Sequence, residues 1–387
     1  MRPYWDDLSM LLYVLMGVVS LISLNFALIY RENNKSKSLL YLSCGIIVWT
    51  IFASFRVVAY GVGGSDAINY VGYFEKCTTG AKVFPYSDHM DWLMGVIITA
   101  IRYCTSNRYL FFIIIYGFMS WTYYYFCYKF APKKSSSIPY FLLFFLYLRS
   151  FCSLRSNFCI SIILLGLVGL FYLKNYKVYL ITFSSVLVHK AGLVFAMVLP
   201  FLQVFKKRKL SVPMVIALIT ISSLLASVLQ MIFLSSFADA DLGGAYQSYA
   251  SESLEGGGFF DNAWKIAMEQ MALGVLMFFN IKNLRRRWST FDEVDKKRIE
   301  IIYLICVFDF MLIPVNYIMS IWRGYEFFYA ARLVMWGEVI ASSPIAKFRI
   351  VKLLIFAAFV AWMIFRVERT YEDSALMPYF FEPLQYI

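Results

Sequence analysis

Apolar segments follow one another along almost the whole of this chain, and the polar stretches between them are short. Hydrophobic residues make up 61% of the 387 residues, which is more apolar surface than a soluble domain of this size buries in its core. A helix that crosses a bilayer needs about 20 mostly apolar residues, and several runs reach that length. The sequence therefore predicts an all-α polytopic membrane protein that forms a single integral membrane domain over residues 1–387.

Hydropathy predicts about 12 transmembrane helices. A further apolar run at 92–104 is too short to cross a hydrocarbon core of about 30 Å, so we expect a short interfacial or re-entrant helix there. The apolar run 178–205 contains His189 and Lys190, and we expect the helix to break at this pair. The predicted spans are 8–30, 39–60, 109–129, 138–152, 156–173, 178–190, 191–205, 210–237, 263–281, 299–321, 329–345 and 350–366.

Loop charges orient these spans, because Lys and Arg gather in the cytoplasmic loops of membrane proteins. With the N-terminus outside, the loops of one side collect most of the basic residues, and the longest of them is the basic cytoplasmic loop 282–298. The external loops 61–92 and 238–262 carry Asp and Glu instead. The pattern predicts that both termini lie outside. It also accounts for the net charge of +12, so the lipid bilayer is an expected partner and nucleic acid is not.

Ionisable residues interrupt the outer ends of several predicted spans. Charges at such depth cost a few kcal/mol to insert, so they usually face a cavity or a partner. Arginine suits phosphate, because its planar fork donates two hydrogen bonds and keeps its charge. Cations gathered on the external side favour an anionic ligand, and at a membrane surface a lipid-linked pyrophosphate is the obvious one. The residues concerned are Arg149, Arg155, His189, Lys190, Arg323 and Arg332.

Ordinary explanations exist for several of these charges. Arg149 and Arg155 flank a turn, and the alternative for both is that they snorkel to phospholipid headgroups. Snorkelling is the expected role of Arg56 and Arg366. Arg323 and Glu326 are three residues apart, a spacing that suits a surface ion pair worth little. Asp309, within a predicted span, is expected to pair with a buried base.

Neither the cysteines nor the histidines show a metal-binding pattern. The seven Cys residues are scattered, and no CxxC or HxxxH spacing occurs. The first external loop contains no DxD-like pair. We therefore expect no disulfide framework, no metal and no cofactor.

Four weak motifs occur in a fixed order along the chain. The first external loop reads GGSDAINYVGYFE, a Gly-x-Asp-x-x-x-Tyr element with Asp66 and Tyr70. In the stretch from LRSNF to VLVHK, Arg155 opens a helix rich in small residues and His189 follows a short Lys-containing turn. YAARLVMWGEVI carries Arg332 in an Arg-Leu element, and the tail ALMPYFF ends the series. In this order the motifs resemble those of Wzy-type polysaccharide polymerases, and within them the EpsG-like branch.

The resemblance implies a metal-independent glycosyltransferase at the external face of the bacterial inner membrane. The donor is a growing chain on undecaprenyl pyrophosphate, and the acceptor is a single lipid-linked oligosaccharide repeat unit. A chain-length regulator and a flippase are the implied partners. The predicted pyrophosphate-binding residues are Arg155 and Arg332, with Arg149 and Arg323 in support. The candidate catalytic residues are His189, Asp66 and Glu326. The candidate sugar-binding residues are Tyr70, Tyr325 and Tyr329.

Two other classes of function stay open. A lipid-linked oligosaccharide flippase or transporter predicts internal repeats and polar residues near the bilayer midplane, whereas the charges of this chain gather at the outer face. An O-antigen ligase shares the lipid-linked donor and typically has a long external loop between late spans. The loop 238–262 is only moderate in length.

Overall fold

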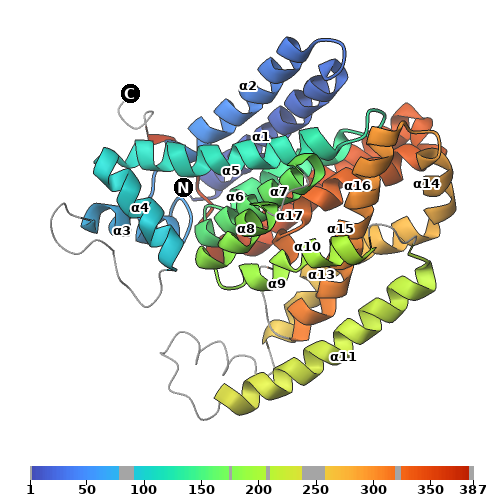
Figure 1. Ribbon diagram of the computed structural model, residues 1–387. Helices are drawn as coiled ribbons and strands as arrows, with labels where there is room; N and C mark the ends of the chain where they lie inside the picture. Colours follow the sequence, from blue (N-terminus) through green and yellow to red (C-terminus); the bar gives the residue numbers. More distant parts are fainter. Residues whose placement is uncertain are drawn as a thin grey trace.

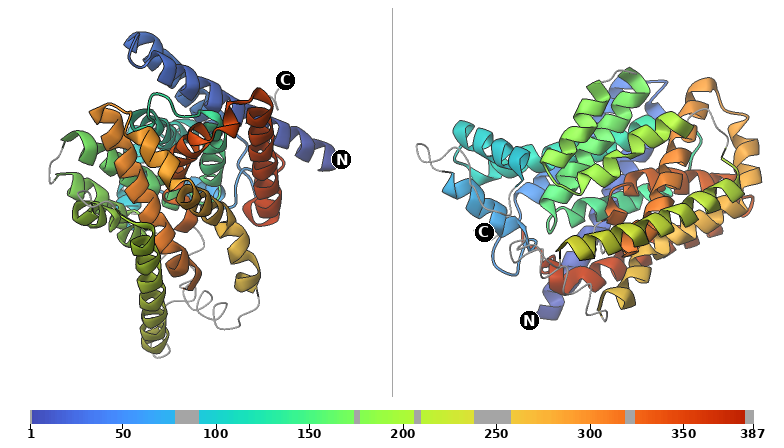
Figure 2. Two further views of the ribbon diagram at one scale, coloured as in Figure 1. Left: turned by 90° about the vertical axis from the view of Figure 1, so that its right-hand side faces the viewer. Right: turned by 60° about the horizontal axis from the view of Figure 1, so that its bottom comes forward.

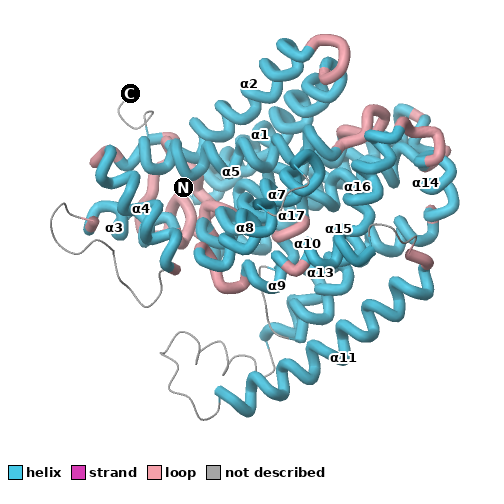
Figure 3. Tube along the Cα trace, in the orientation of Figure 1, coloured by secondary structure: helices cyan, strands magenta, loops and turns pink. Residues whose placement is uncertain are grey.

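The computed structural model describes residues 2–77, 91–173, 177–205, 210–237, 258–318 and 324–382. Within these ranges the chain is helical, and the only β structure is two isolated bridges (Figure 3). The helices of the first half are α1 (Arg2–Tyr30), α2 (Lys35–Ser54), α3 (Ala67–Lys76), α4 (Trp92–Cys104), α5 (Arg108–Phe130), η1 (Ile138–Leu142), α6 (Leu143–Arg149) and α7 (Leu154–Leu173). Those that follow are α8 (Lys177–Ser184), η2 (Ser185–Leu187), α9 (Gly192–Ala196), α10 (Val198–Phe205), α11 (Val212–Phe237), α13 (Gly258–Phe279), α14 (Ile281–Trp288), α15 (Glu293–Ile318), η3 (Gly324–Glu326), α16 (Tyr329–Ser342), η4 (Ile345–Lys347) and α17 (Arg349–Ser374).

Among the residues that the structure describes, six helices are long and apolar enough to cross a membrane, which makes the chain a multi-pass helical membrane protein. They are Asp6–Tyr30, Lys35–Ser54, Arg108–Phe130, Leu154–Phe171, Glu293–Asn316 and Arg349–Arg369. The remaining predicted spans contain shorter apolar stretches among the described residues, including Val212–Val228 of α11 and Ala267–Phe279 of α13. One of them, α16, has 14 residues and is about 21 Å long. The number of 12 crossings and the external position of both termini therefore stay predictions.

The structure confirms one predicted short helix and one predicted helix break, and it corrects the end of one predicted span. The short helix predicted at 92–104 is α4, and the run 178–205 breaks around His189 and Lys190, between η2 and α9. The predicted span 39–60 is too long, because α2 ends at Ser54 and the chain turns through Gly63 and Gly64, whose φ angles are +82° and +103°. The basic segment 282–298 contains most of α14 and the beginning of α15, and its position on the cytoplasmic side stays a prediction.

Three long helices and an aromatic core organise one side of the molecule. Helix α2 packs against both α1 and α5, and α7 packs on α5 (Figure 1). Trp49 is fully buried and stacks on Tyr147, with ring centroids 4.8 Å apart. On the other side α15 packs against α11 and α16, and two further views show α11 lying along the surface away from α1 and α2 (Figure 2). Aromatic rings that bury a large apolar area thus fill the space between these helices.

The chain returns to its own beginning at one end of the helical bundle. The ring of Tyr379 stacks on Phe52 at 4.2 Å, its hydroxyl donates to the Phe52 carbonyl at 2.7 Å, and its backbone N–H donates to Ser9 Oγ at 2.7 Å. Nearby, the backbone N–H of Gly64 donates to the Ala375 carbonyl at 2.9 Å. The C-terminal segment thus fixes the turn that leads into α3, where Asp66 lies.

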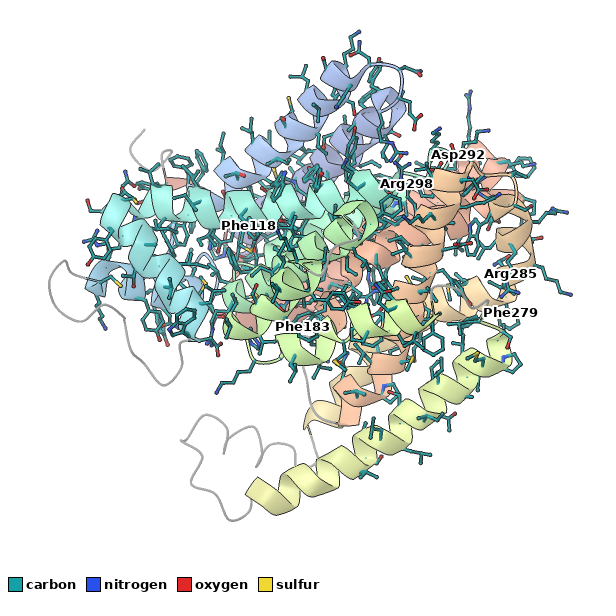
Figure 4. All side chains as sticks on the ribbon, viewed as in Figure 1. Phe118, Phe183, Phe279, Arg285, Asp292 and Arg298 are labelled. Atoms are coloured by element: carbon teal, nitrogen blue, oxygen red, sulfur yellow. The ribbon has the colours of Figure 1, made fainter. Side chains whose placement is uncertain are left out.

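The opposite end of these helices carries a network of ion pairs. Lys133, just after α5, lies 2.9 Å from Asp292 and 3.0 Å from Glu32, which follows α1. Arg298 pairs with Asp295 at 2.6 Å in the first turns of α15, and Figure 4 shows Asp292 and Arg298 together at this end. This is the end that the loop charges predict to be cytoplasmic.

Candidate functional site

Arg155 lies in the first turn of α7 and brings together residues from distant parts of the chain. Its Nη1 donates to Asp91 Oδ2 at 3.1 Å, with 28% and 15% of the two side chains exposed. The guanidinium also interacts with Tyr70 and, through charge, with Asp66. Lys190 acts on the Asp91 carboxylate from the turn before α9. We call these five residues the Arg155 group.

Local backbone geometry explains why these segments meet. The turn before α7 is closed by backbone hydrogen bonds from Ser150 and Phe151 to the end of α6. A Cβ added to Gly64 would lie 2.1 Å from the Phe151 carbonyl oxygen, so only glycine allows the loop before α3 to approach this turn. Asp91 is the residue immediately before α4. Asp66, Asp91 and Arg155 each lie at the beginning of a helix, namely α3, α4 and α7. The close backbone contact at Gly64 holds the loop before α3 against the turn before α7.

The Asp91 carboxyl has an altered acidity. Burial raises the pKa of Asp91, although the charges of Arg155 and Lys190 act in the opposite direction. The two cations hold the Asp91 side chain in place. Because the side chain is partly buried, it is protonated more readily than a fully solvated carboxylate.

His189 lies half-buried in the same turn as Lys190. Its Nδ1 accepts a hydrogen bond from the backbone N–H of Ala191 at 3.2 Å. A neutral imidazole whose Nδ1 accepts carries its proton on Nε2, so His189 presents a donor there. This tautomer suits a hydrogen bond to a sugar or phosphate oxygen better than it suits proton abstraction.

A second group surrounds Arg149 and is more deeply buried. Arg149 Nε donates to Glu326 Oε1 at 2.9 Å, and Asn157 Nδ2 donates to Glu326 Oε2 at 3.3 Å. Tyr123 in turn donates its hydroxyl to Asn157 Oδ1 at 2.8 Å. Glu326 is 1% exposed and each of its oxygens accepts a hydrogen bond. It therefore serves as the counter-ion that orients Arg149.

Glu326 is 1% exposed and therefore does not lie at the surface, as the alternative of a surface pair with Arg323 would require. Its carboxylate is bound by Arg149, which is 177 positions away in the sequence. Arg323 lies outside the described residues. Asn157 was missed at the sequence level, although an Asn two positions after Arg155 within a predicted span is a polar signal of the same kind.

Arg332 is fully buried and is bound on several sides. Its Nη1 donates to Asp309 Oδ2 at 2.7 Å, its Nη2 donates to the Tyr325 carbonyl at 2.5 Å, and its Nε lies 3.4 Å from Glu269 Oε2. Each carboxylate also accepts a hydrogen bond from another side chain. Gln270 donates to Asp309 at 2.9 Å, and Trp336 donates to Glu269 at 3.0 Å. The expected partner of Asp309 is thus Arg332.

Two arginines expected to snorkel are buried instead. Arg56 is 1% exposed, donates to the Gly63 carbonyl and to the Tyr116 hydroxyl at 2.7 Å each, and lies 4.0 Å from the Phe151 ring centroid. Arg366 is 4% exposed. The prediction was wrong for both, because the side chains point into the bundle, where aromatic rings and backbone carbonyls from other segments receive them.

The predicted aromatic residues lie close to these arginines. Tyr70 belongs to the Arg155 group, while Tyr325 and Tyr329 are buried beside η3 and the start of α16. Within the described ranges no group of three His, Cys, Asp or Glu side chains is arranged to hold a metal ion. The side chains of these groups can bind anions, exchange hydrogen bonds and transfer protons.

Comparison with known proteins adds one finding. The model of the EpsG family matches residues 39–381, a segment that contains every predicted site residue. The comparisons with curated proteins and with solved structures gave no match.

Proposed function

The chain belongs to the EpsG family, whose members are polysaccharide polymerase-type membrane proteins, and on this premise we propose a specific reaction. The protein joins undecaprenyl-pyrophosphate-linked oligosaccharide repeat units by glycosyl transfer at the external face of the bacterial inner membrane. The growing chain is the donor, a single lipid-linked unit is the acceptor, and a flippase and a chain-length regulator are the partners.

The reaction needs an anion site and a base. An acceptor hydroxyl oxygen forms a bond to the anomeric carbon of the donor sugar, and the bond from that carbon to the pyrophosphate oxygen breaks. Undecaprenyl pyrophosphate leaves with the electron pair, and the hydroxyl proton passes to a base. Cationic donors fixed in advance lower the barrier, because negative charge grows on the leaving oxygen.

The observation that carries the proposal is the Arg155 group. Arg155 keeps 28% of its side chain exposed and has Lys190 in its surroundings, so a diphosphate can reach it. A diphosphate exchanges with Asp91 for the same guanidinium, and Arg149 supports it from the end of α6. Arg332 is fully buried against two carboxylates, so we assign it to bracing the helices rather than to direct contact with the substrate.

Asp66 is the base that we favour among the three candidates. It is half-exposed and lies beside Arg155, where the reacting centre would be. Glu326 is sealed between Arg149 and Asn157, and His189 presents a donor at Nε2. In this assignment Asp66 accepts the proton, His189 donates to an oxygen of the substrate, and Tyr70 contacts a sugar ring.

The proposal is tested by the gel profile of surface polysaccharide from a strain that lacks this protein. Wild-type protein should restore long polymer. Arg155→Ala should restore only single repeat units at normal protein abundance, His189→Ala should shorten the polymer, and Arg332→Ala should lower the abundance of the protein itself. Arg108→Gln is the matched control, because Arg108 pairs with Glu382 outside the Arg155 group.

Two other profiles would contradict the proposal. Lipid-linked repeat units that accumulate on the cytoplasmic side of the deletion strain would identify a flippase. Full-length polymer left unattached to its final acceptor would identify a ligase. Long polymer with Arg155→Ala, at a level equal to that of wild type, would remove Arg155 from the mechanism.

A further inference from the structure

Arg56 follows the last turn of α2 and is buried inside the bundle, with 1% of its surface exposed. Its hydrogen-bond acceptors among the described residues are the carbonyls of Ala53 and Gly63 and the hydroxyl of Tyr116, all of which are neutral. Burial of a guanidinium carries a large desolvation cost, and an apolar side chain of similar volume often stabilises a core equally well. The segments that Arg56 joins therefore indicate what it contributes.

The first of these segments leads to Asp66. Nε of Arg56 donates to the Gly63 carbonyl at 2.7 Å, in the turn of residues 61–64, which we call the Gly63 turn. Gly63 and Gly64 have φ angles of +82° and +103°, so this backbone is not helical and needs bonds from outside to fix it. Asp66 lies two positions after the turn, at the beginning of α3. The bond from Arg56 thus orients the peptide group that precedes the Asp66 segment.

The second segment leads to Arg155. The central carbon of the Arg56 guanidinium lies 4.0 Å from the ring centroid of Phe151. Nη2 donates to the Tyr116 hydroxyl at 2.7 Å, and this hydroxyl donates to the Ser150 carbonyl at 3.5 Å. Residues 150–153, which we call the Phe151 turn, join α6 to α7, and Arg155 lies in the first turn of α7. One guanidinium therefore contacts both turns that carry the Arg155 group.

The planar shape of arginine suits this position, because its donors point in fixed directions. Nη1 donates to Ala53 in α2, Nε donates to Gly63 in the Gly63 turn, and Nη2 donates to Tyr116 in α5. Lysine carries a compact ammonium on a flexible stem and has no flat face to lie over a ring. A change in these contacts therefore shifts the Gly63 turn relative to α5 and to the Phe151 turn.

We propose that Arg56 is a positioning residue for the glycosyl transfer. Through its contacts with the two turns it sets the distance between Asp66, the base that we favour, and Arg155, which binds the leaving group. A reacting group displaced by about 1 Å can lower the rate about 100-fold, so a small shift between the turns matters. The inference rests on the proposed function, because it concerns the relative placement of two residues of that reaction.

The test measures polymerisation of lipid-linked repeat units by the purified full-length protein in lipid nanodiscs. Turnover is divided by the number of sites that bind undecaprenyl pyrophosphate, so that unfolded molecules do not count. Tyr116→Phe keeps Arg56 and removes the hydroxyl that links it to Ser150. This variant should lower kcat by about 10-fold while KM changes by less than about threefold, because Arg155 still binds the diphosphate.

Tyr124→Phe is the matched control for this variant. Tyr124 is fully buried in the same helix, about 12 Å further along, and its hydroxyl accepts a hydrogen bond from Ser23 at 3.2 Å. Each variant loses one buried hydroxyl, so a loss of stability alone should appear in both. If Tyr116 is only structural, both variants will keep the wild-type kcat per binding site.

Two changes of Arg56 itself examine the guanidinium. Arg56→Gln should lower kcat by about 100-fold, because the contacts with both turns are lost together. Arg56→Lys should restore only part of this loss, because it keeps the charge and loses the fork. A kcat of Arg56→Lys equal to that of wild type would overturn the role assigned to the fork.

The outcomes distinguish failure of the inference from failure of the proposed function. If the wild-type protein binds no undecaprenyl pyrophosphate or forms no polymer, the proposed function fails and this inference fails with it. If the wild-type protein forms polymer, and Tyr116→Phe and Arg56→Lys turn over as fast as Tyr124→Phe, the proposed function stands and Arg56 is structural. If Arg56→Gln does not fold, the measurements on Tyr116→Phe and Arg56→Lys decide between the two.

Discussion

Replacing Arg332 by methionine should destabilise the folded protein severely. The change keeps an unbranched apolar side chain in the same space and removes the guanidinium. Asp309 and Glu269 then remain buried beside each other without their shared counter-ion, and the Tyr325 carbonyl loses the donor that holds η3 against α16.

The size of the effect follows from these contacts. Removal of one partner of a buried ion pair typically costs about 3–5 kcal/mol, because a charge stays behind without compensation. Two carboxylates stay behind here, so we expect the loss to reach at least the upper part of that range. Asp309→Asn should cost less, because Arg332 keeps Glu269 and the asparagine still accepts from Gln270.

The assay is reversible unfolding of the purified protein in detergent micelles, with the free energy of unfolding as the readout. The triple variant Arg332→Met, Asp309→Asn, Glu269→Gln removes the stranded charges and should recover at least half of the loss. A loss below about 1 kcal/mol for Arg332→Met would refute the assignment of Arg332 as a brace. It would return Arg332 to the set of direct substrate ligands.

Three further predictions concern the surroundings of the Arg155 group. Gly64→Ala should lower the melting temperature, because φ is +103° and the new Cβ would lie 2.1 Å from the Phe151 carbonyl oxygen. Gly72→Ala is the control and should change little, since no atom lies within 4 Å of its added Cβ. Equal melting temperatures of the two variants would contradict this prediction. Tyr379→Phe should lower the free energy of unfolding by about 0.5–1.5 kcal/mol, since the Phe52 carbonyl loses its hydrogen-bond donor while the ring stacking stays. Tyr60→Phe, at an exposed position, is the control. Equal free energies of unfolding for the two variants would argue against the hydrogen bond from Tyr379 to Phe52. Since burial raises the pKa of Asp91, the folded chain binds this proton more tightly than the unfolded chain, so stability falls as pH rises from about 4 through the raised pKa. Unfolding measured against pH should therefore show wild type losing stability relative to Asp91→Asn over that window, and parallel curves would count against the shift.

Hydropathy predicted most of the helices, because apolar length and interruption are local properties of the sequence. The short helix α4 and the break at His189 and Lys190 both follow from counting apolar residues. The number of crossings was harder to predict, since it depends on whether consecutive short helices stack along the membrane normal. The run 138–152 illustrates this, because it forms η1 and the seven-residue α6 rather than one straight helix.

The roles of the arginines depended on partners that no local pattern shows. Arg56 and Arg366 look alike in sequence, each near the end of an apolar run, and both were expected to snorkel. Each is buried because residues from other helices supply rings or carbonyls at the right depth. The sequence spacing suggested Arg323, which lies outside the described residues, as one partner of Glu326, and no local pattern indicated Arg149, with which Glu326 pairs. At the sequence level, only the order of the four motifs indicated that Asp66, Tyr70 and Arg155 belong to one site. In the structure these three residues lie close together.

The exposure and the counter-ions of the arginines together indicate how readily each could bind a substrate phosphate. Arg332 has two carboxylates and no exposed surface, so a diphosphate would have to displace two anions and open the core to reach it. Arg149 has one carboxylate and 11% exposure, and Arg155 has one carboxylate at 3.1 Å and 28% exposure. The energy needed to exchange a protein carboxylate for a substrate phosphate falls in that order, because burial decreases at each step and Arg332 pairs with two carboxylates. A diphosphate should therefore bind first at Arg155, where Asp91 is the anion that it displaces.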